Sequence, residues 1–471
     1  MGTRVNISYS PSVDPNEFGH FRLTFKHNEE EEHTTDLKFN FSELWDFSRD
    51  TSSVAFDFLI LAMVVYNTDR AISRERYSFN GWRRQIYIEN VPVINLSLMN
   101  RGREAFNRAI NFLTGDTWDI NFVQAGSYNY NPNDRPLYNL AEYEKVSLFS
   151  GGLDSLIGFV DEASSLLPDR KIVLVSHVEL GKEGKDQENI LNICKAKSYF
   201  DSQYLQLKLN VGLKKGTWNI PTQAESTFRA RSLLFFAAGI YVANSISPST
   251  KLIVPENGTI SINIPLDVSR RGACSTRTTH PTFIKRLQDA LSRVGITNEL
   301  FNPYQLKSKA DMMSDAFNDH SKKLILTNLY KASCSCAKRG HNSYWDKNGE
   351  EIHDLAIRHC GMCLPCLYRR VALDSVGLDN PEDYGTDVNH GTKYNIDNLN
   401  QKRVWDYRAL LSFIKLRNTE EVIRAELMLN GISDKQELSD YTQLALNSYE
   451  QVKEWIRKNA NSNIRRKAGL R

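Results

Sequence analysis

Two groups of residues in this chain have types and spacings that could do chemistry. The first is Ser150-Gly-Gly-Leu-Asp-Ser155, called the Ser150 loop below, which combines two glycines with two hydroxyls at the start of an apolar helical pattern. Glycines let a backbone approach a ligand closely, and the N–H groups at a helix start attract anions. The second group places five of the seven cysteines between Cys334 and Cys366. The sequence therefore predicts a phosphate cradle and a metal site.

The surroundings of the Ser150 loop support the phosphate cradle. A short apolar run at residues 146–149 precedes it, and Leu153, Leu156, Ile157 and Val160 then recur at helical spacing. The loop should therefore lie at a strand-to-helix turn, where the helix dipole adds to the free N–H groups. A P-loop needs four positions between its glycines and a lysine after the second, so this loop is of another kind.

The cysteine spacing predicts a structural zinc site. Cys360, Cys363 and Cys366 form two successive CxxC steps, which aim three thiolates at one point. Cys334 or Cys336 must supply the fourth ligand of a tetrahedral Cys₄ site. We favour Cys334, because it lies nearer the end of a strand expected at residues 324–327.

Other ligand sets were also considered. A redox CxxC pair is the main alternative, although the additional cysteines argue against it. A nearby histidine could replace one thiolate, from the set His341, His353 and His359. Four thiolates would leave no open position, which indicates a structural role and not a catalytic one.

Composition limits the class of protein. A chain of 471 residues can form two or three domains, and a formal net charge of +3 gives no strong field for nucleic acid or an acidic membrane. The longest apolar stretch, residues 58–66, is far shorter than the about 20 residues of a membrane span. The start lacks a signal-peptide pattern, so we expect a cytoplasmic protein. In that reducing compartment we expect the clustered thiols to bind metal, and Cys194 and Cys274 to be unbridged.

The pattern of elements predicts three parts. Residues 1–125 read as an α+β domain, with strands at 5–9, 20–25 and 84–89 and a helix at 54–66. Turn formers mark a linker at 126–144. Residues 145–378 alternate strands at 172–175, 204–209 and 252–254 with helices such as 228–246, which predicts a doubly wound parallel α/β sheet. Residues 379–471 read as a helical extension.

The Ser150 loop resembles the PP-loop of the N-type ATP pyrophosphatases. In these enzymes the loop holds the pyrophosphate of ATP while a substrate oxygen attacks the α-phosphorus. The resemblance implies that ATP is bound at the carboxyl ends of the parallel strands, with Mg²⁺ bridging the phosphates. The residues implied in holding the pyrophosphate are Ser150, Gly151, Gly152, Leu153, Asp154 and Ser155.

Together, the loop and the zinc knot resemble 7-cyano-7-deazaguanine synthase of queuosine biosynthesis over residues 146–378. That family adenylates 7-carboxy-7-deazaguanine and replaces AMP with ammonia, which finally gives a nitrile. The resemblance implies that Arg231 and Lys309 act with Asp154 and Ser155 in catalysis, and that Asn257 lies in the nucleotide pocket.

The departures from that family are also informative. Its Tyr-Pro-Asp-Cys-Arg substrate motif is replaced here by a segment from Cys274 to Pro281, so Arg277, Thr278 and His280 become the candidates for substrate binding, with structural or surface roles as the alternative. The zinc knot is interrupted between Cys336 and Cys360. The added N-terminal domain and C-terminal tail are similar to the longer proteins of bacterial anti-phage cassettes, the Qat and type IV CBASS systems.

The resemblance implies an ATP-dependent carbon–nitrogen ligase that releases AMP and pyrophosphate. Its acyl substrate would be a deazaguanine carboxylate, and its acceptor the amino terminus of a partner protein recruited by residues 1–125. The alternatives are nitrile synthesis with ammonia, a tRNA-modifying sulfurtransferase and a non-catalytic scaffold. No direct contact with nucleic acid or membrane is expected.

Overall fold

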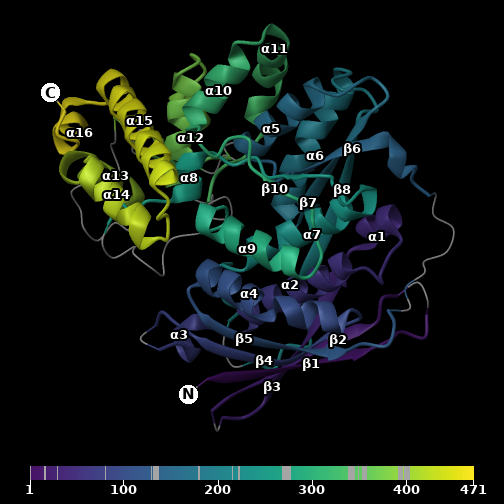
Figure 1. Cartoon of the computed structure of the whole chain (residues 1–471). Helices are drawn as coiled ribbons and strands as arrows, with labels where there is room; N and C mark the ends of the chain where they lie inside the picture. Colours follow the sequence, from purple (N-terminus) through teal and green to yellow (C-terminus); the bar gives the residue numbers. More distant parts are fainter. Residues whose placement is uncertain are drawn as a thin grey trace.

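The computed structural model describes most of the chain, and Figure 1 shows its arrangement. The described residues are 2–14, 17–28, 30–79, 81–128, 130, 137–178, 181–214, 216–220, 223–267, 277–337, 345–347, 350–352, 358–390, 396 and 404–470. The fold is mixed α/β and is built on one large sheet in which parallel pairs outnumber antiparallel ones.

The sheet has ten strands in the order β10-β9-β6-β7-β8-β3-β2-β1-β4-β5. The first five in this order are mutually parallel, the pairs from β8 to β1 are antiparallel, and β1, β4 and β5 are again parallel. A separate hairpin joins β11 (Trp345–Lys347) and β12 (Glu350–Ile352). The strands of the sheet are β1 (Thr3–Ser10), β2 (His20–His27), β3 (His33–Asn40), β4 (Gln85–Val93), β5 (Thr117–Gln124), β6 (Tyr143–Leu148), β7 (Lys171–His177), β8 (Tyr204–Leu213), β9 (Leu252–Ile253) and β10 (Leu300–Phe301).

The helices confirm most of the expected pattern. The predicted helix at 54–66 lies within α2, the helix after the Ser150 loop is α5, and the predicted helix at 228–246 corresponds to α7. The helices are α1 (Ser42–Ser48), α2 (Val54–Ala71), α3 (Arg74–Tyr77), α4 (Leu96–Thr114), α5 (Leu153–Ser164), α6 (Gly181–Ala196), α7 (Arg231–Ile246), α8 (Gly258–Ile262), α9 (Pro281–Arg293), α10 (Lys309–Phe317), α11 (His320–Leu329), α12 (Leu364–Asp374), α13 (Trp405–Leu416), α14 (Glu420–Leu429), α15 (Lys435–Asn459) and α16 (Ser462–Lys467).

The expected strand at residues 324–327 is wrong, because these residues lie inside α11. Asp319 caps that helix by accepting hydrogen bonds from the N–H groups of Ser321 and Lys322. A short apolar run fits a strand or a helix equally well, and here the cap upstream selects the helix.

Helices cover both faces of the parallel part of the sheet. Alternate residues of β7 face opposite sides: Val173 and Val175 join the core that contains α7, whereas Ile172 and Leu174 join the core that contains α5. This arrangement is typical of a buried parallel sheet with crossover helices. The N-terminal strands differ, since Figure 1 shows α2 and α4 on one face of β1, β4 and β5 and, within the described part of the chain, no helix on the other.

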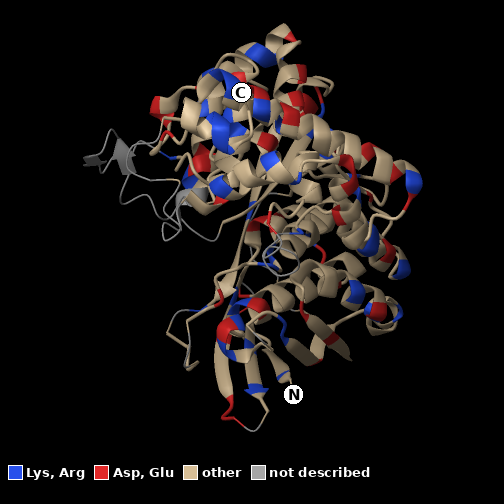
Figure 2. Cartoon of the chain, turned by 90° about the vertical axis from the view of Figure 1, so that its left-hand side faces the viewer, with Lys and Arg blue, Asp and Glu red and all other residues tan. Residues whose placement is uncertain are grey.

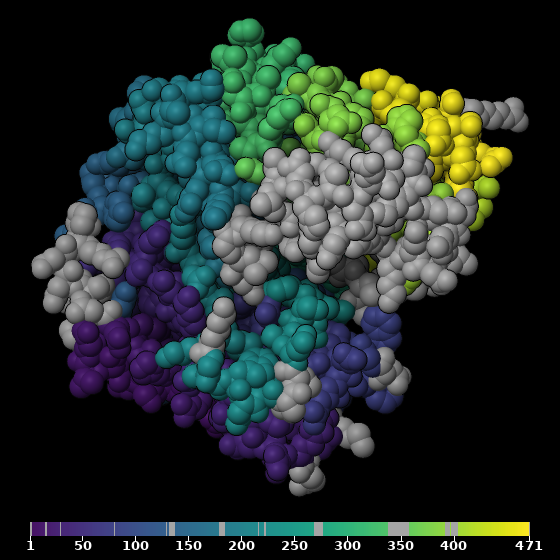
Figure 3. All heavy atoms as spheres, turned by 180° about the vertical axis from the view of Figure 1, so that it is seen from behind, coloured from purple at the N-terminus to yellow at the C-terminus, as the bar shows by residue number. Residues whose placement is uncertain are grey.

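The sheet runs without interruption from the N-terminal segment into the central one. Leu37 to Asn40 of β3 pair with Asn210 to Leu213 of β8. Helix α2 is buried along almost its whole length and packs against α7. Figure 3 shows the same union, with N-terminal residues lying against residues from the middle of the chain. Residues 1–125 and the central segment therefore share one sheet and one core.

The C-terminal helices and the distribution of charged residues are the remaining features of the fold. Helices α13 to α16 form a group beside α12 and α8, as Figure 1 shows, which fits the expected helical extension. Lys and Arg are interspersed with Asp and Glu on the face presented in Figure 2. In the described part of the chain, no helix has both the length and the apolar character needed to cross a bilayer.

Candidate functional site

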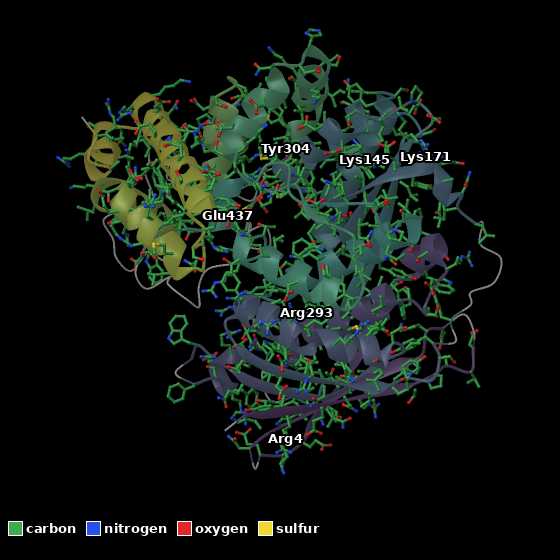
Figure 4. All side chains as sticks on the ribbon, in the orientation of Figure 1. Arg4, Lys145, Lys171, Arg293, Tyr304 and Glu437 are labelled. Carbon is green, nitrogen blue, oxygen red and sulfur yellow. The ribbon has the colours of Figure 1, made fainter. Side chains whose placement is uncertain are left out.

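The Ser150 loop lies where its sequence predicts, between the end of β6 and the start of α5. Gly151 has a φ of +80°, a conformation that residues with a Cβ rarely adopt. The Ser155 hydroxyl lies 3.0 Å from the Gly152 carbonyl oxygen, to which it donates, and 3.2 Å from the Ser150 hydroxyl. These contacts fix a tight turn at the carboxyl edge of the sheet. Figure 4 labels Lys145 of β6 and Lys171 of the neighbouring β7. Both lysines lie at or near the amino-terminal ends of their strands, away from the loop.

A short segment from another part of the chain holds the loop in place. We call residues 334–336 the linking segment. The Cys334 N–H donates to the Gly151 carbonyl oxygen at 2.8 Å, and the Leu153 N–H donates to the Ser335 hydroxyl at 3.2 Å. Ser335 thus occupies one of the helix-start N–H groups that an anion would use. A phosphate that took this N–H would have to share it with Ser335 or displace it.

The linking segment ends in a four-cysteine group. Cys336, Cys360, Cys363 and Cys366 are all buried, and their sulfur atoms lie within 4.8 Å of one another. The Cys360 and Cys366 sulfurs are 3.8 Å apart, which matches the about 3.8 Å edge of a tetrahedron with Zn–S bonds of about 2.3 Å. The four side chains therefore fit a closed zinc site.

Backbone donors stabilise a thiolate in this group. The N–H groups of Met362 and Cys363 each donate to the Cys360 sulfur at 3.3 Å. Hydrogen bonds from the neighbouring thiols, together with the Met362 N–H, hold the pKa of Cys360 far below its ordinary value. A ligand sulfur that is already poised as a thiolate favours metal binding.

The fourth cysteine of the group is Cys336, so the preference for Cys334 is corrected. The preference assumed a strand at 324–327, but α11 occupies those residues, so the argument from the end of a strand does not hold. Cys334 instead binds the Ser150 loop through its backbone and lies on the wall of a cavity. His359 accepts a hydrogen bond from the Ser335 N–H at 3.3 Å, outside the group. His341 and His353 lie outside the described residues.

A cavity of about 320 Å³ opens beside the loop at the carboxyl ends of β6, β7 and β9. Its wall combines loop residues, cationic groups, carboxyl groups and apolar side chains. The lining residues are Ser150, Gly152, Leu153, Asp154, His177, Asp186, Arg231, Phe235, Pro255, Glu256, Ile260, Lys309, Cys334, Ser335, Cys336, Ala337 and Pro365. Of the four predicted catalytic residues, Asp154, Lys309 and Arg231 meet here, whereas Ser155 is buried within the loop.

Asp154 is the centre of a buried polar cluster. Its Oδ1 lies 2.7 Å from the Lys309 Nζ, and its Oδ2 accepts a hydrogen bond from the Asn257 Nδ2 at 2.8 Å. Burial alone would raise the pKa of Asp154, but the charge of Lys309 and hydrogen bonds from its neighbours outweigh burial and lower it. Burial and the Asp154 charge raise the pKa of Glu256 well above its ordinary value. In this pair the ionised form is therefore favoured at Asp154 and the protonated form at Glu256.

Asn257, predicted in the nucleotide pocket, and Lys309, predicted as catalytic, both belong to this cluster. Asn257 is fully buried, caps α8 through the Ile260 N–H and supports Asp154. Lys309 is the first residue of α10, whose start is fixed by a capping box between Ser308 and Asp311. The ammonium group is thus held at a defined point beside the loop.

The predicted substrate residues lie elsewhere. Arg277 stacks over the Phe112 ring at 4.5 Å and donates to the Phe112 carbonyl oxygen at 2.9 Å. His280 caps α9, because its Nδ1 accepts the Thr282 N–H at 3.2 Å. Neither these two residues nor Thr278 is part of the cavity wall described here, and residues 268–276, which include Cys274, lie outside the described residues.

Several wall residues were not predicted from the sequence. His177, Asp186, Glu256 and Ser335 come from four separate segments, and only the fold brings them together. The position of His177 at the end of a buried strand could have indicated it, since the carboxyl edge of a parallel sheet is the usual place for ligands.

A buried ion-pair network ties the N-terminal segment to this site. Arg84 lies 2.7 Å and Arg74 2.6 Å from Asp116. Asp69, which also pairs with Arg84, accepts a hydrogen bond from the Ala230 N–H at 3.1 Å. Ala230 precedes Arg231, so the network fixes the start of the helix that carries a cavity residue.

Comparisons of the chain with known protein families, with curated proteins and with solved structures found no match.

Proposed function

We propose that this protein is an ATP-dependent ligase that adenylates a 7-deazaguanine carboxylate and joins it to an amine. The observation that carries the proposal is the Ser150 loop, at a strand-to-helix turn, on one wall of a cavity that Lys309 and Arg231 also line. Backbone N–H groups, a helix start and two cations suit a polyphosphate. An intact loop also argues against a scaffold that has lost activity.

The reaction would proceed in two balanced steps. A carboxylate oxygen attacks the α-phosphorus, the bond from that phosphorus to the bridging oxygen breaks, and pyrophosphate leaves with the electron pair. An amine then attacks the acyl carbon, AMP leaves, and the amine loses a proton. The loop N–H groups and Lys309 are held in place before the reaction, so they can stabilise the leaving group without reorganising. Mg²⁺ bound with the ATP would offset the negative charge of its phosphates, and the four-cysteine group would hold zinc with no open position.

The test is to follow ATP consumption with and without 7-carboxy-7-deazaguanine. We expect AMP and pyrophosphate only when this carboxylate is present, and none with Asp154→Asn, which removes the ionic partner of Lys309. Asp289→Asn, on the exposed face of α9, is the matched control and should behave as the wild type. Formation of ADP and phosphate would overturn the proposal.

The acceptor decides between two versions of this function. Ammonia would give a primary amide and then a nitrile, whereas a protein amino terminus would give a stable conjugate in a defence system. To distinguish these two versions, the adenylating enzyme is supplied either with ammonia or with the protein product of a neighbouring gene. We expect the protein conjugate.

A sulfurtransferase is the second candidate, favoured by one observation. Cys334 lies on the cavity wall and is outside the four-cysteine group, where a thiol could carry sulfur. Cys194 is a poor partner for it, because burial raises the pKa of Cys194 to about 12. Cys334→Ser should keep AMP formation if the ligase proposal is correct, and should abolish turnover in a sulfurtransferase.

A further inference from the structure

His177 is a polar side chain on the cavity wall that has no role in the proposed chemistry so far. It is the last residue of β7 and only 1% exposed. The rings of Tyr66 and Phe235 contact it edge-on, with ring centres 5.6 Å and 5.4 Å away. Tyr66 belongs to α2, so the N-terminal segment supports this part of the cavity.

The ring of His177 is neutral and poorly satisfied. Burial and the charge of Arg231 lower its pKa to about 3. An interaction with the Val211 backbone, which favours the charged ring, opposes this shift. A neutral imidazole offers one N–H donor and one acceptor nitrogen. Neither nitrogen makes a hydrogen bond of ordinary geometry with any residue that the structure describes. The Val211 backbone can engage at most one of the two nitrogens, so at least one buried polar atom lacks a partner among the described residues. Such an atom destabilises the protein, and its position beside a cavity indicates a partner that arrives with a ligand.

The neighbouring side chains restrict the chemistry of that ligand. Arg231 repels a cation at this point, and Phe235, Pro255 and Ile260 add apolar surface to the cavity wall. We propose that His177 recognises the edge of an uncharged planar nitrogen heterocycle bound in the cavity, through a hydrogen bond to one of its ring nitrogens. Under the proposed function, on which this assignment rests, the heterocycle is the adenine of ATP or the deazaguanine of the acyl substrate.

His280 is a matched control within the same chain. It is also 1% exposed, and burial together with the charge of Arg277 lowers its pKa to about 3. Its Nδ1, however, caps α9, so that among the described residues only its Nε2 lacks a partner. The residue is not part of the described cavity wall. One buried histidine thus has a structural partner, while the other faces a cavity.

The experiment compares His177→Phe, His177→Leu and His280→Phe in the full chain. Thermal unfolding is measured without ligand, and binding of adenosine and of 7-deazaguanine is measured by calorimetry. Both His177 variants should unfold at or above the wild-type temperature, because each removes an unsatisfied polar group. They should lose about tenfold or more in affinity for one heterocycle, the loss expected for one hydrogen bond, and His177→Gln should restore part of it. His280→Phe should unfold at a lower temperature and bind both ligands normally.

The ligand that loses affinity identifies the source of the heterocycle. A loss for adenosine assigns His177 to the nucleotide, and a loss for 7-deazaguanine assigns it to the acyl substrate. Unchanged affinity for both, lower stability of both His177 variants, or a wild type that binds neither compound would overturn the assignment. Neither probe carries a carboxylate or a phosphate, so this result is independent of whether the protein forms AMP.

Discussion

Asp154 and Glu256 show how two adjacent carboxyl groups can take different charges inside a protein. Lys309, 2.7 Å from Asp154, stabilises the ionised form of that residue. The charged carboxylate of Asp154 lies beside Glu256. Ionising both residues would therefore place two negative charges together in a buried site. The protonation of this pair is therefore linked to stability.

Glu256→Gln should change the pH dependence of stability. The folded-state pKa of Glu256 is raised, so above pH about 4.5 the unfolded chain releases a proton that the folded protein retains. Wild-type stability should fall as pH rises from about 4.5 toward that raised pKa, by about 1.4 kcal/mol for each unit of the shift. Urea unfolding between pH 4 and 8 should show a flatter profile for the variant, with the gain at the alkaline end. An identical slope in both proteins would contradict this account.

Lys309→Met should be strongly destabilising and inactive. Removing one member of a buried ion pair leaves an uncompensated charge, which costs about 3–5 kcal/mol. The double variant Asp154→Asn, Lys309→Met should recover much of the stability, because no charge is left unpaired, but it should form no AMP. Thermal unfolding and a pyrophosphate assay separate the two effects. Recovery of activity in the double variant would show that the pair is only structural.

At the scale of elements, the linking segment joins the four-cysteine group to the Ser150 loop. Cys336 belongs to the group, and the two residues before it hydrogen-bond to Gly151 and Leu153. The order of the Ser150 loop should therefore depend on a metal bound by the four-cysteine group.

Extraction of the metal should loosen the Ser150 loop. Chelation, or Cys363→Ser, should lower the melting temperature and speed amide hydrogen exchange in residues 150–153, because the linking segment loses its anchor. Cys194→Ser is the control, since this thiol is buried outside the group and should leave exchange in the loop unchanged. Elemental analysis should find one zinc per chain. Unchanged exchange in metal-free protein would show that the two sites are independent.

The sequence predicted local features of the fold better than contacts between distant segments. The Ser150 loop and most strands and helices follow from short patterns, and the three CxxC cysteines follow from their spacing. Residues 324–327 fit a strand but lie in α11, because a short apolar run does not distinguish a strand from a helix. His177 and Ser335 could not be assigned to one cavity, because their proximity depends on the packing of segments far apart in the chain.

At the scale of the whole molecule, the pairing of β3 with β8 makes the N-terminal segment part of the central fold. No sequence pattern specifies that register, since the paired residues are widely separated along the chain. Tyr66 and Asp69 of α2 reach the neighbourhood of the cavity from this segment. Recruitment of the acceptor by residues 1–125 remains a prediction, and it needs a test that keeps the segment in place.

Deletion of residues 1–125 should prevent folding. It would expose the edge of β8 and the face of α7 that α2 covers, and it would leave the start of α7 without Asp69. We expect insoluble protein, or soluble protein without a cooperative thermal transition. A truncated chain that unfolds cooperatively would show that the central segment is an independent domain.

Reversal of charge on the face of the N-terminal sheet opposite α2 and α4 is the sharper test of acceptor binding. The side chains of Arg4 and Arg22 are 79% and 60% exposed, and neither contributes to the core. Figure 4 shows Arg4 on the side of the sheet away from the helices. Arg4→Glu with Arg22→Glu should leave AMP formation unchanged and reduce transfer to a protein acceptor, if this face binds it. Transfer at the original rate would exclude the face as the docking surface.

The central claim is that a carboxylate oxygen of the substrate becomes bonded to the α-phosphorus of ATP. The most direct measurement uses 7-carboxy-7-deazaguanine labelled with a heavy oxygen isotope in both carboxylate positions, followed by mass spectrometry of the products. Adenylation and amine transfer should leave one labelled oxygen in AMP and the other in the amide. Unlabelled AMP, or label in inorganic phosphate, would contradict the account.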